Sequence, residues 1–260
     1  MKKYLVVLSA LVLIAFSSCK KFAGDPIEKD FNIDGAYTEL EVMDAFDVIV
    51  SDEVNLITVT AGENIMPKVV VEKVGNTLKI HLKPLTNSFG SDLKVVLPYN
   101  ADLTSVELSG ASEFRSGYGL KGNKIEVESS GASEFYCDIE ANDITLDLSG
   151  ASKIESNIAA KNLDIELSGA SDATLIGNVN NLKLDLSGAS NIIKTIVERH
   201  YGLACDLCVG EMSGASDAYI HCDGTIKVDL SGASDLHFTG HAFTGDCSTS
   251  GGSDIIHDVL

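Results

Sequence analysis

Residues 168–186 read S-G-A-S-D-A-T-L-I-G-N-V-N-N-L-K-L-D-L and are one copy of the repeat that decides the fold. Its opening tetrapeptide, Ser-Gly-Ala-Ser, begins at Ser109, Ser130, Ser149, Ser168, Ser187, Ser213 and Ser231, with a Ser-Gly-Gly-Ser variant at Ser250. The intervals between successive copies are 21, 19, 19, 19, 26, 18 and 19 residues. A unit this short holds only a few short strands and cannot bury a core alone, so neighbouring units must stack.

The end of each unit alternates apolar and polar residues, as a strand with one buried face does. The apolar triplets are Leu182, Leu184, Leu186; Ile144, Leu146, Leu148; Leu163, Ile165, Leu167; and Ile226, Val228, Leu230. Gly-Ala then makes a corner, because glycine permits positive φ and a larger side chain would clash. The near-constant phase predicts an all-β, right-handed parallel β-helix, or solenoid, over 109–260. An antiparallel β meander or barrel stays open as the alternative.

Residues 31–108 lack the tetrapeptide and are expected to form an irregular, strand-rich N-terminal part of the same domain. Strand candidates are residues 57–60, 69–72, 78–82 and 93–97. Residues 40–47 resemble one repeat unit, in which a strand is followed by a corner and an acidic residue. This suggests an opening unit that covers the first edge of the stack.

The N-terminus is typical of a bacterial lipoprotein signal. Lys2 and Lys3 precede an apolar stretch too short to span a bilayer, and small residues then precede Cys19. We expect a signal peptide over 1–18, lipidation of Cys19 with palmitate among the acyl chains, and a tether over 19–30. An ordinary cleaved signal is the alternative. The lipid would hold the protein to the outer membrane, with the periplasmic or surface face left open.

The formal net charge is −19. Such an acidic body repels nucleic acid and anionic membrane surfaces, so we expect no nucleic-acid partner.

The chain resembles the family called putative auto-transporter adhesin, head GIN domain. The resemblance rests on Val95-Val96-Leu97-Pro98 before the first repeat and on the series of Leu-Ser-Gly-Ala-Ser phrases, and it covers roughly residues 36–254. It implies a β-helical fold and a cell-envelope location, commonly in bacteria of the Bacteroidota type.

Two acidic stripes flank the tetrapeptides. Two residues before each copy stand Glu107, Glu128, Asp147, Glu166, Asp185, Glu211, Asp229 and Ser248, and directly after it stand Glu113, Glu134, Lys153, Asp172, Asn191, Asp217, Asp235 and Asp254. Carboxylates stacked in this way suit Ca²⁺, but they equally keep an edge-rich β protein soluble, which is the reading we favour. Catalysis needs carboxylates in different environments, so equivalent copies predict no enzyme, no catalytic residue and no cofactor beyond a Ca²⁺ ion.

The 26-residue interval breaks the pattern with about seven extra residues between Asn191 and Met212. Insertions of this kind often lie on a binding face, so Arg199, His200 and Tyr201 are candidates for contact with a glycan or a protein. The alternative is a loop without a function.

Cysteines and histidines complete the inventory of reactive side chains. Cys205 and Cys208 form a C-x-x-C without a thioredoxin-like setting, so we expect this pair, Cys137, Cys222 and Cys247 to be structural. His237 and His241 lack the helix that would make their spacing a metal motif. No metal site is predicted.

These features predict a non-catalytic, lipid-anchored cell-envelope protein that serves as an adhesin-like scaffold for a glycan or a protein. The alternatives are a polysaccharide-active β-helix enzyme and a calcium-stabilised structural module of the envelope. Because the last unit has no evident cap, a homo-oligomer is also expected.

Overall fold

A computed structural model describes residues 23–260, so Cys19 and the signal segment lie outside the described residues. The chain is all-β, apart from a short 3-10 helix, η1 (Met66–Lys68). The strands are β1 (Pro26–Phe31), β2 (Glu39–Val42), β3 (Phe46–Ser51), β4 (Ile57–Gly62), β5 (Val69–Val74), β6 (Thr77–Leu82), β7 (Leu93–Pro98), β8 (Ser105–Leu108), β9 (Glu113–Arg115), β10 (Leu120–Ser129), β11 (Glu134–Tyr136), β12 (Ile139–Leu148), β13 (Lys153–Leu167), β14 (Asp172–Leu186), β15 (Asn191–Ile192), β16 (Ile196–Val197), β17 (His200–Tyr201), β18 (Leu203–Met212), β19 (Asp217–Leu230), β20 (Asp235–Thr239), β21 (Ser248–Thr249) and β22 (Asp254–His257).

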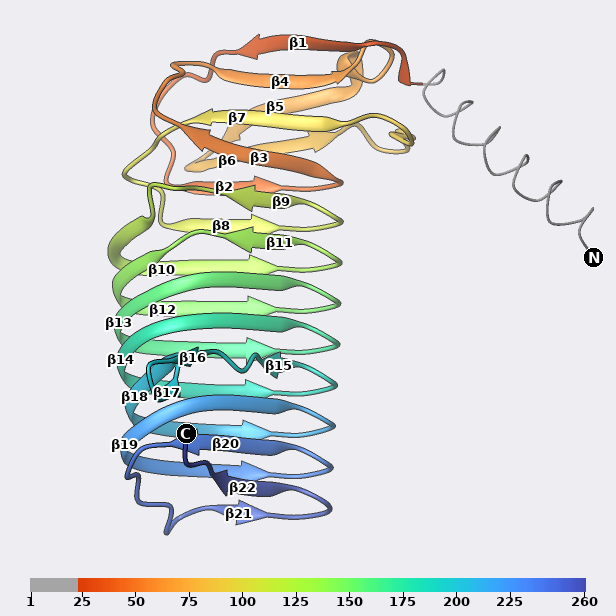
Figure 1. Ribbon diagram of the computed structural model, residues 1–260. Coiled ribbons are helices and arrows are strands. Elements are labelled where there is room, and N and C mark those ends of the chain that lie inside the picture. The colour runs from red at the N-terminus through yellow and green to blue at the C-terminus, as the bar shows by residue number, and fades with distance from the viewer. Residues whose placement is uncertain (1–22) are drawn as a thin grey trace, which may run out of the picture.

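The repeats stack in register, with like residues above like. Ile144 pairs with Leu163, which pairs with Leu182, so the same position recurs in β12, β13 and β14 at steps of 19 residues. These side chains are buried, as are their equivalents in the other units, and together they fill one continuous core. Figure 1 shows the tetrapeptide corners aligned along one edge of the stack and the bends of β13, β14 and β19 along the other.

Each tetrapeptide corner is held by backbone contact with the corner of the preceding unit. The Ala151 N–H donates to the Gly131 carbonyl at 2.7 Å, and the same bond recurs at 2.7 Å from Ala170 to Gly150. A Cβ on Gly150 would lie 2.5 Å from that Gly131 oxygen, and its φ is +76°. Close stacking and a left-handed backbone therefore both require glycine here.

The second serine of the corner is buried and its hydroxyl is satisfied locally. Ser152 Oγ donates to the Ser149 carbonyl at 2.7 Å, and Ser171 Oγ donates to the Ser168 carbonyl at 2.9 Å. The hydroxyl therefore caps the turn from within without leaving an unpaired polar atom, which explains why the tetrapeptide ends in serine.

The predicted fold class, a right-handed parallel β-helix, is wrong for this chain. The strands form a mixed 20-stranded sheet, in which β1 pairs with β4, β4 with β7 and β5 with β6 in antiparallel fashion. The physical reason lies in the N-terminal part, where the short Gly75-Asn76 turn reverses the chain directly between β5 and β6. The antiparallel alternative is not the whole answer either, because β8 to β15 and β18 to β22 pair in parallel.

The N-terminal strands continue the stack and then cover its first edge. β2 pairs in parallel with β8, and Asp44 adopts the corner conformation beneath Gly110 with a φ of 73°. This confirms the echo of the repeat in residues 40–47. β1 forms the outermost layer (Figure 1) and begins at Pro26, inside the segment expected to be a tether.

The two acidic stripes are true ladders. Glu128 lies between Glu107 and Asp147, and the register continues to Asp229 through adjacent strands. Burial raises the pKa of Glu128, and the neighbouring carboxylates of Glu107, Glu126 and Asp147 raise it further. Within residues 23–260, however, no group of three or more His, Cys, Asp or Glu side chains is arranged to hold a metal ion.

Candidate functional site

The regular stack is hollowed where the first unit is two residues longer than the 19-residue units that follow it. Arg115 pairs with Tyr136, 21 residues on, whereas Leu120 pairs with Ile139, only 19 residues on. The two extra residues are therefore accommodated between positions 116 and 119. Two of these four residues are glycines that add no side chain, and Tyr118 between them points outward.

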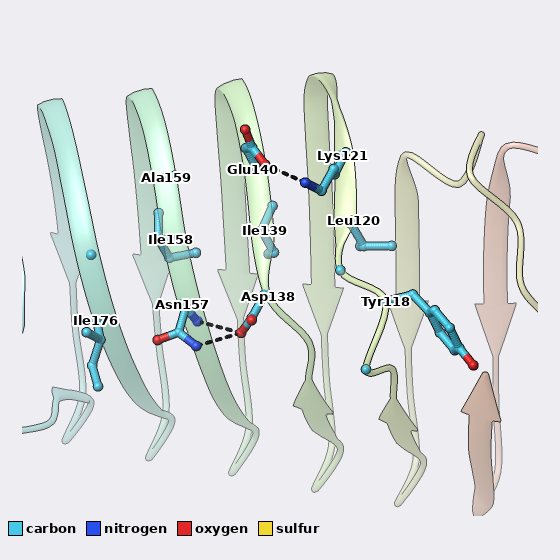
Figure 2. Close-up of a pocket in the computed structure, with 13 residues that line it drawn as sticks. Tyr118, Leu120, Lys121, Asp138, Ile139, Glu140, Asn157, Ile158, Ala159 and Ile176 are labelled. Carbon is cyan, nitrogen blue, oxygen red and sulfur yellow. Dashed lines mark hydrogen bonds and ion pairs between the residues drawn. The ribbon is translucent and has the colours of Figure 1, made fainter. Parts of the chain in front are cut away.

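This irregularity opens a groove of about 420 Å³, which we call the corner groove (Figure 2). It crosses four successive units at the bend opposite the tetrapeptide corners. It is lined by Gly117, Tyr118, Gly119, Leu120, Lys121, Asp138, Ile139, Glu140, Asn157, Ile158, Ala159, Ile176 and Gly177.

The floor of the corner groove is an apolar ladder. Leu120, Ile139 and Ile158 stack in register and are almost completely buried. The next rung is Gly177, where a Cβ would lie 1.9 Å from the Ile158 carbonyl oxygen. Glycine at this rung lets the two backbones approach closely, and the ladder supports the groove from within the core.

The walls of the corner groove are polar and already paired. Asp138 Oδ1 accepts hydrogen bonds from Asn157 through its backbone N–H at 3.2 Å and its side-chain amide at 2.8 Å. On the other side, Lys121 Nζ lies 2.7 Å from Glu140 Oε2, as the dashed lines in Figure 2 show. This pairing lowers the pKa of Glu140 and raises that of Lys121. Both walls therefore present fixed donors and acceptors.

Tyr118 stands at one end of the corner groove with its ring in solvent. The side chain is 37% exposed, and its hydroxyl donates to Asp52 Oδ1 at 2.6 Å, which fixes the ring. The hydrogen bond to Asp52 also raises the pKa of Tyr118. Tyr99 packs beside it with ring centroids 4.9 Å apart, so two exposed aromatic rings form one rigid platform.

A second hollow of about 350 Å³ adjoins the corner groove and shares Gly117, Asp138, Asn157 and Ile176 with it. Tyr136 lies along it, and the Arg115 guanidinium carbon sits 3.7 Å from the centre of that ring. Aromatic and charged groups thus continue along the same bend.

The insertion predicted between Asn191 and Met212 forms a small hairpin outside the main sheet. β16 pairs with β17 in antiparallel fashion, and the parallel stacking resumes where Leu203 pairs with Gly177. The three candidate residues of the insertion lie in different environments: Arg199 is exposed, His200 is half-buried and Tyr201 is fully buried. Arg199 and His200 therefore remain accessible to a partner, and Tyr201 faces the protein.

Tyr201 anchors the insertion. Its hydroxyl donates to Asp258 Oδ2, its backbone N–H donates to Thr239 Oγ1 at 3.2 Å, and its ring packs edge-on against Tyr219. The His237 ring stacks on Tyr219, and His237 Nδ1 lies 2.9 Å from Asp258 Oδ2. The hairpin is thereby tied to the last strands of the stack.

The hydrogen bonds of Tyr201 and His237 with Asp258 make the stability of the protein depend on pH. Burial raises the pKa of Asp258, but the hydrogen bonds from Tyr201 and His237 outweigh this effect and lower it below its ordinary value of 3.8. A carboxylate with a depressed pKa contributes stability that is fully present above its unfolded-state pKa and is lost as pH falls through the folded-state value. We expect the stability difference between the wild type and Asp258→Asn to shrink below about pH 4. Urea unfolding from pH 6 to pH 2 would measure it, and a constant difference would contradict the assignment.

The five cysteines of the described chain are free, and four of them are buried. Burial raises the pKa of Cys137 to about 11. Hydrogen bonding with Cys208 raises the pKa of Cys205, and hydrogen bonding with Cys205 raises that of Cys222. Protonated, buried thiols are poor nucleophiles, in keeping with a structural role.

Comparison with known proteins identifies the family of this chain. The model of the family described as putative auto-transporter adhesin, head GIN domain, matches residues 36–157 and 138–242. The chain therefore belongs to this family, which confirms the resemblance seen in its sequence. No curated protein matches the chain.

Solved structures share the fold at low sequence identity. A putative adhesin from Parabacteroides distasonis is 18% identical with a TM-score of 0.78, covering 90% of this chain and 98% of that one. A putative lipid binding protein from the same organism is 19% identical with a TM-score of 0.76, covering 90% and 97%. A putative adhesin from Parabacteroides merdae is 17% identical with a TM-score of 0.77, with the same coverages. Residues 23–260 contain no helix long and apolar enough to cross a membrane.

Proposed function

We propose that this chain is a non-catalytic, adhesin-like scaffold of the cell envelope, and that the corner groove binds a glycan. The observation that carries the proposal is the fixed, exposed Tyr118 ring at one end of the corner groove, beside its paired polar walls. A sugar ring presents apolar C–H faces and a rim of hydroxyls, so an aromatic platform beside paired polar side chains complements it.

Two further observations support this function. The names of the family and of two of the structural neighbours are those of adhesins. The groove carboxylate of Glu140 has a lowered pKa because Lys121 pairs with it, whereas a glycosidase acid needs a raised one. The groove thus suits binding better than hydrolysis.

We also propose how the chain is attached to the membrane and how it associates with its own copies. Lipidation of Cys19 would hold the chain to the outer membrane after removal of residues 1–18, and the domain would extend from residue 31 through the repeats to residue 260. Arg199 and His200 on the insertion would offer a second contact surface, and self-association would cover the last edge of the stack.

The decisive test is binding to a panel of immobilised bacterial and host glycans. Tyr118→Ala should weaken binding of the best ligand about tenfold, the loss expected for one aromatic stacking contact of roughly 1.4 kcal/mol. Tyr118→Phe should retain most of the affinity because it keeps the ring.

Phe243→Ala is the matched control, since this exposed aromatic residue pairs with Thr225 of β19 and does not line the groove. Equal binding by wild type and Tyr118→Ala would disprove the glycan site. Release of reducing ends from the panel would disprove the non-catalytic assignment.

A further inference from the structure

The loop between β6 and β7, residues 83–92, exposes two large apolar side chains. Leu85 is fully exposed and Phe89 is 67% exposed, which makes them two of the most exposed large apolar residues in residues 23–260. Leu85 also has a left-handed backbone with a φ of 62°, which is uncommon for a bulky residue and turns its side chain away from the sheet. Two large apolar side chains on one short loop are unfavourable in water, so we expect a partner that buries them.

Local hydrogen bonds give the loop a defined shape. The Thr86 hydroxyl donates to the Lys83 carbonyl at 2.6 Å, and the Phe89 N–H donates to Asn87 Oδ1 at 3.0 Å. The Ser91 N–H donates to the Ser88 carbonyl at 2.9 Å. The two apolar side chains are therefore presented by turns with their own bonds, and ordering them costs little on contact.

The loop lies beside the point where the described chain begins. Ser91 Oγ accepts the Gly62 N–H at 3.0 Å, and two residues further on, the Asn64 N–H donates to the Ala23 carbonyl at 3.0 Å. The loop and the start of the described chain are thus both bonded to the same short turn after β4. Figure 1 shows them projecting on the same side of the molecule.

The distance along the chain to Cys19 limits where a lipid anchor can be. Cys19 precedes Ala23 by four residues. Four residues span at most about 14 Å when fully extended. A membrane that holds the lipid must therefore pass close to Ala23, and so close to the loop.

The charge of the protein favours a small apolar contact with the membrane over a broad electrostatic contact with its headgroups. The chain carries −19 overall, which repels anionic headgroups. Around the loop, however, Lys83 Nζ reaches the Pro67 carbonyl at 3.1 Å, which sets it beside Lys68. The loop itself also carries one acid, Asp92, so its charge is mixed.

We infer that residues 83–92 form a membrane-contact loop, in which Leu85 and Phe89 enter the bilayer interface beside the lipid on Cys19. The inference rests on the lipid anchor proposed above and not on glycan binding. The two inserted side chains give the protein a second point of attachment to the membrane, besides the lipid on Cys19. Two points of attachment fix the tilt of the stack on the membrane.

Tryptophan fluorescence tests this inference cleanly, because the chain contains no tryptophan. Phe89→Trp places the probe in the loop. Phe243→Trp is the matched control, because Phe243 is 64% exposed and pairs with Thr225 of β19, which does not contact the loop's neighbours β4 and β7. Each full chain, carrying its lipid, is reconstituted in vesicles of phosphatidylethanolamine and phosphatidylglycerol with brominated acyl chains.

We expect brominated lipid to quench most of the Phe89→Trp emission and none of the Phe243→Trp emission. Adding Leu85→Asp to Phe89→Trp should abolish the quenching, because a carboxylate is costly to bury, while the melting temperature stays unchanged because Leu85 is fully exposed. Unquenched Phe89→Trp in chains that float with the vesicles would overturn the loop contact alone. Chains that fail to float would overturn the anchor and this inference together, whatever their glycan binding.

Discussion

Replacing Gly150 with alanine should lower the free energy of unfolding by about 3 kcal/mol. Two costs add at this position. The left-handed φ of +76° is unfavourable for any residue with a Cβ, and that Cβ would lie 2.5 Å from the Gly131 carbonyl oxygen of the preceding unit. The clash cannot be relieved by a side-chain rotation, since the neighbouring oxygen belongs to the backbone. The shift of the urea unfolding midpoint, followed by circular dichroism, measures the loss.

Gly75→Ala separates the two costs. Gly75 has a similar φ of +64°, but a Cβ there meets nothing within 4 Å. It should therefore lose only about 1 kcal/mol, the cost of the left-handed backbone alone. Equal losses in the two variants would show that close stacking of the corners does not contribute to stability.

Replacing Tyr201 with alanine should be comparably damaging, with a loss of about 3–5 kcal/mol. The ring is fully buried, and its hydroxyl and backbone tie the insertion to Asp258 and Thr239. Tyr201→Phe keeps the ring and loses only the hydroxyl bond, at a cost of about 1 kcal/mol. The order of these two losses distinguishes packing from hydrogen bonding.

Limited trypsin digestion offers an independent measurement for the same variants. Lys194 and Arg199 lie in the insertion and are exposed, so release of the anchor should speed cleavage at both. Ile196→Ala is the control, because this residue of the same hairpin is 53% exposed and should change stability by less than about 0.5 kcal/mol. A Tyr201→Ala chain that resists trypsin like the wild type would contradict the anchoring role.

The sequence predicted the stacking and the N-terminal strands, but not how those strands pair. The phase of Ser-Gly-Ala-Ser indicated the in-register ladders, because only stacked corners require the same glycine in every unit. The antiparallel pairing of β5 and β6 was not predicted, although Gly75-Asn76 between two strand-like runs is a hairpin signal. A strong repeat in one part of a chain does not determine the strand directions in the segment that precedes it.

The candidate site was only half visible in the sequence. The 26-residue interval predicted the insertion. The 21-residue interval around Tyr118 predicted no site, although its two extra residues open the corner groove. Burial could not be foreseen for Tyr201, because its partner Asp258 lies 57 residues further along the chain. A small departure from a regular spacing therefore deserves the same weight as a large one.

The corner bond, from the alanine N–H of one unit to the glycine carbonyl of the preceding unit, has an evolutionary consequence. Each unit offers its neighbour the same backbone atoms that it receives from the unit before, so the joint between any two units is interchangeable. Duplication or loss of one 19-residue segment would lengthen or shorten the protein by a single strand spacing, about 4.8 Å, with every joint conserved. The length of the stack can in this way be selected in small increments, without any redesign of the interior.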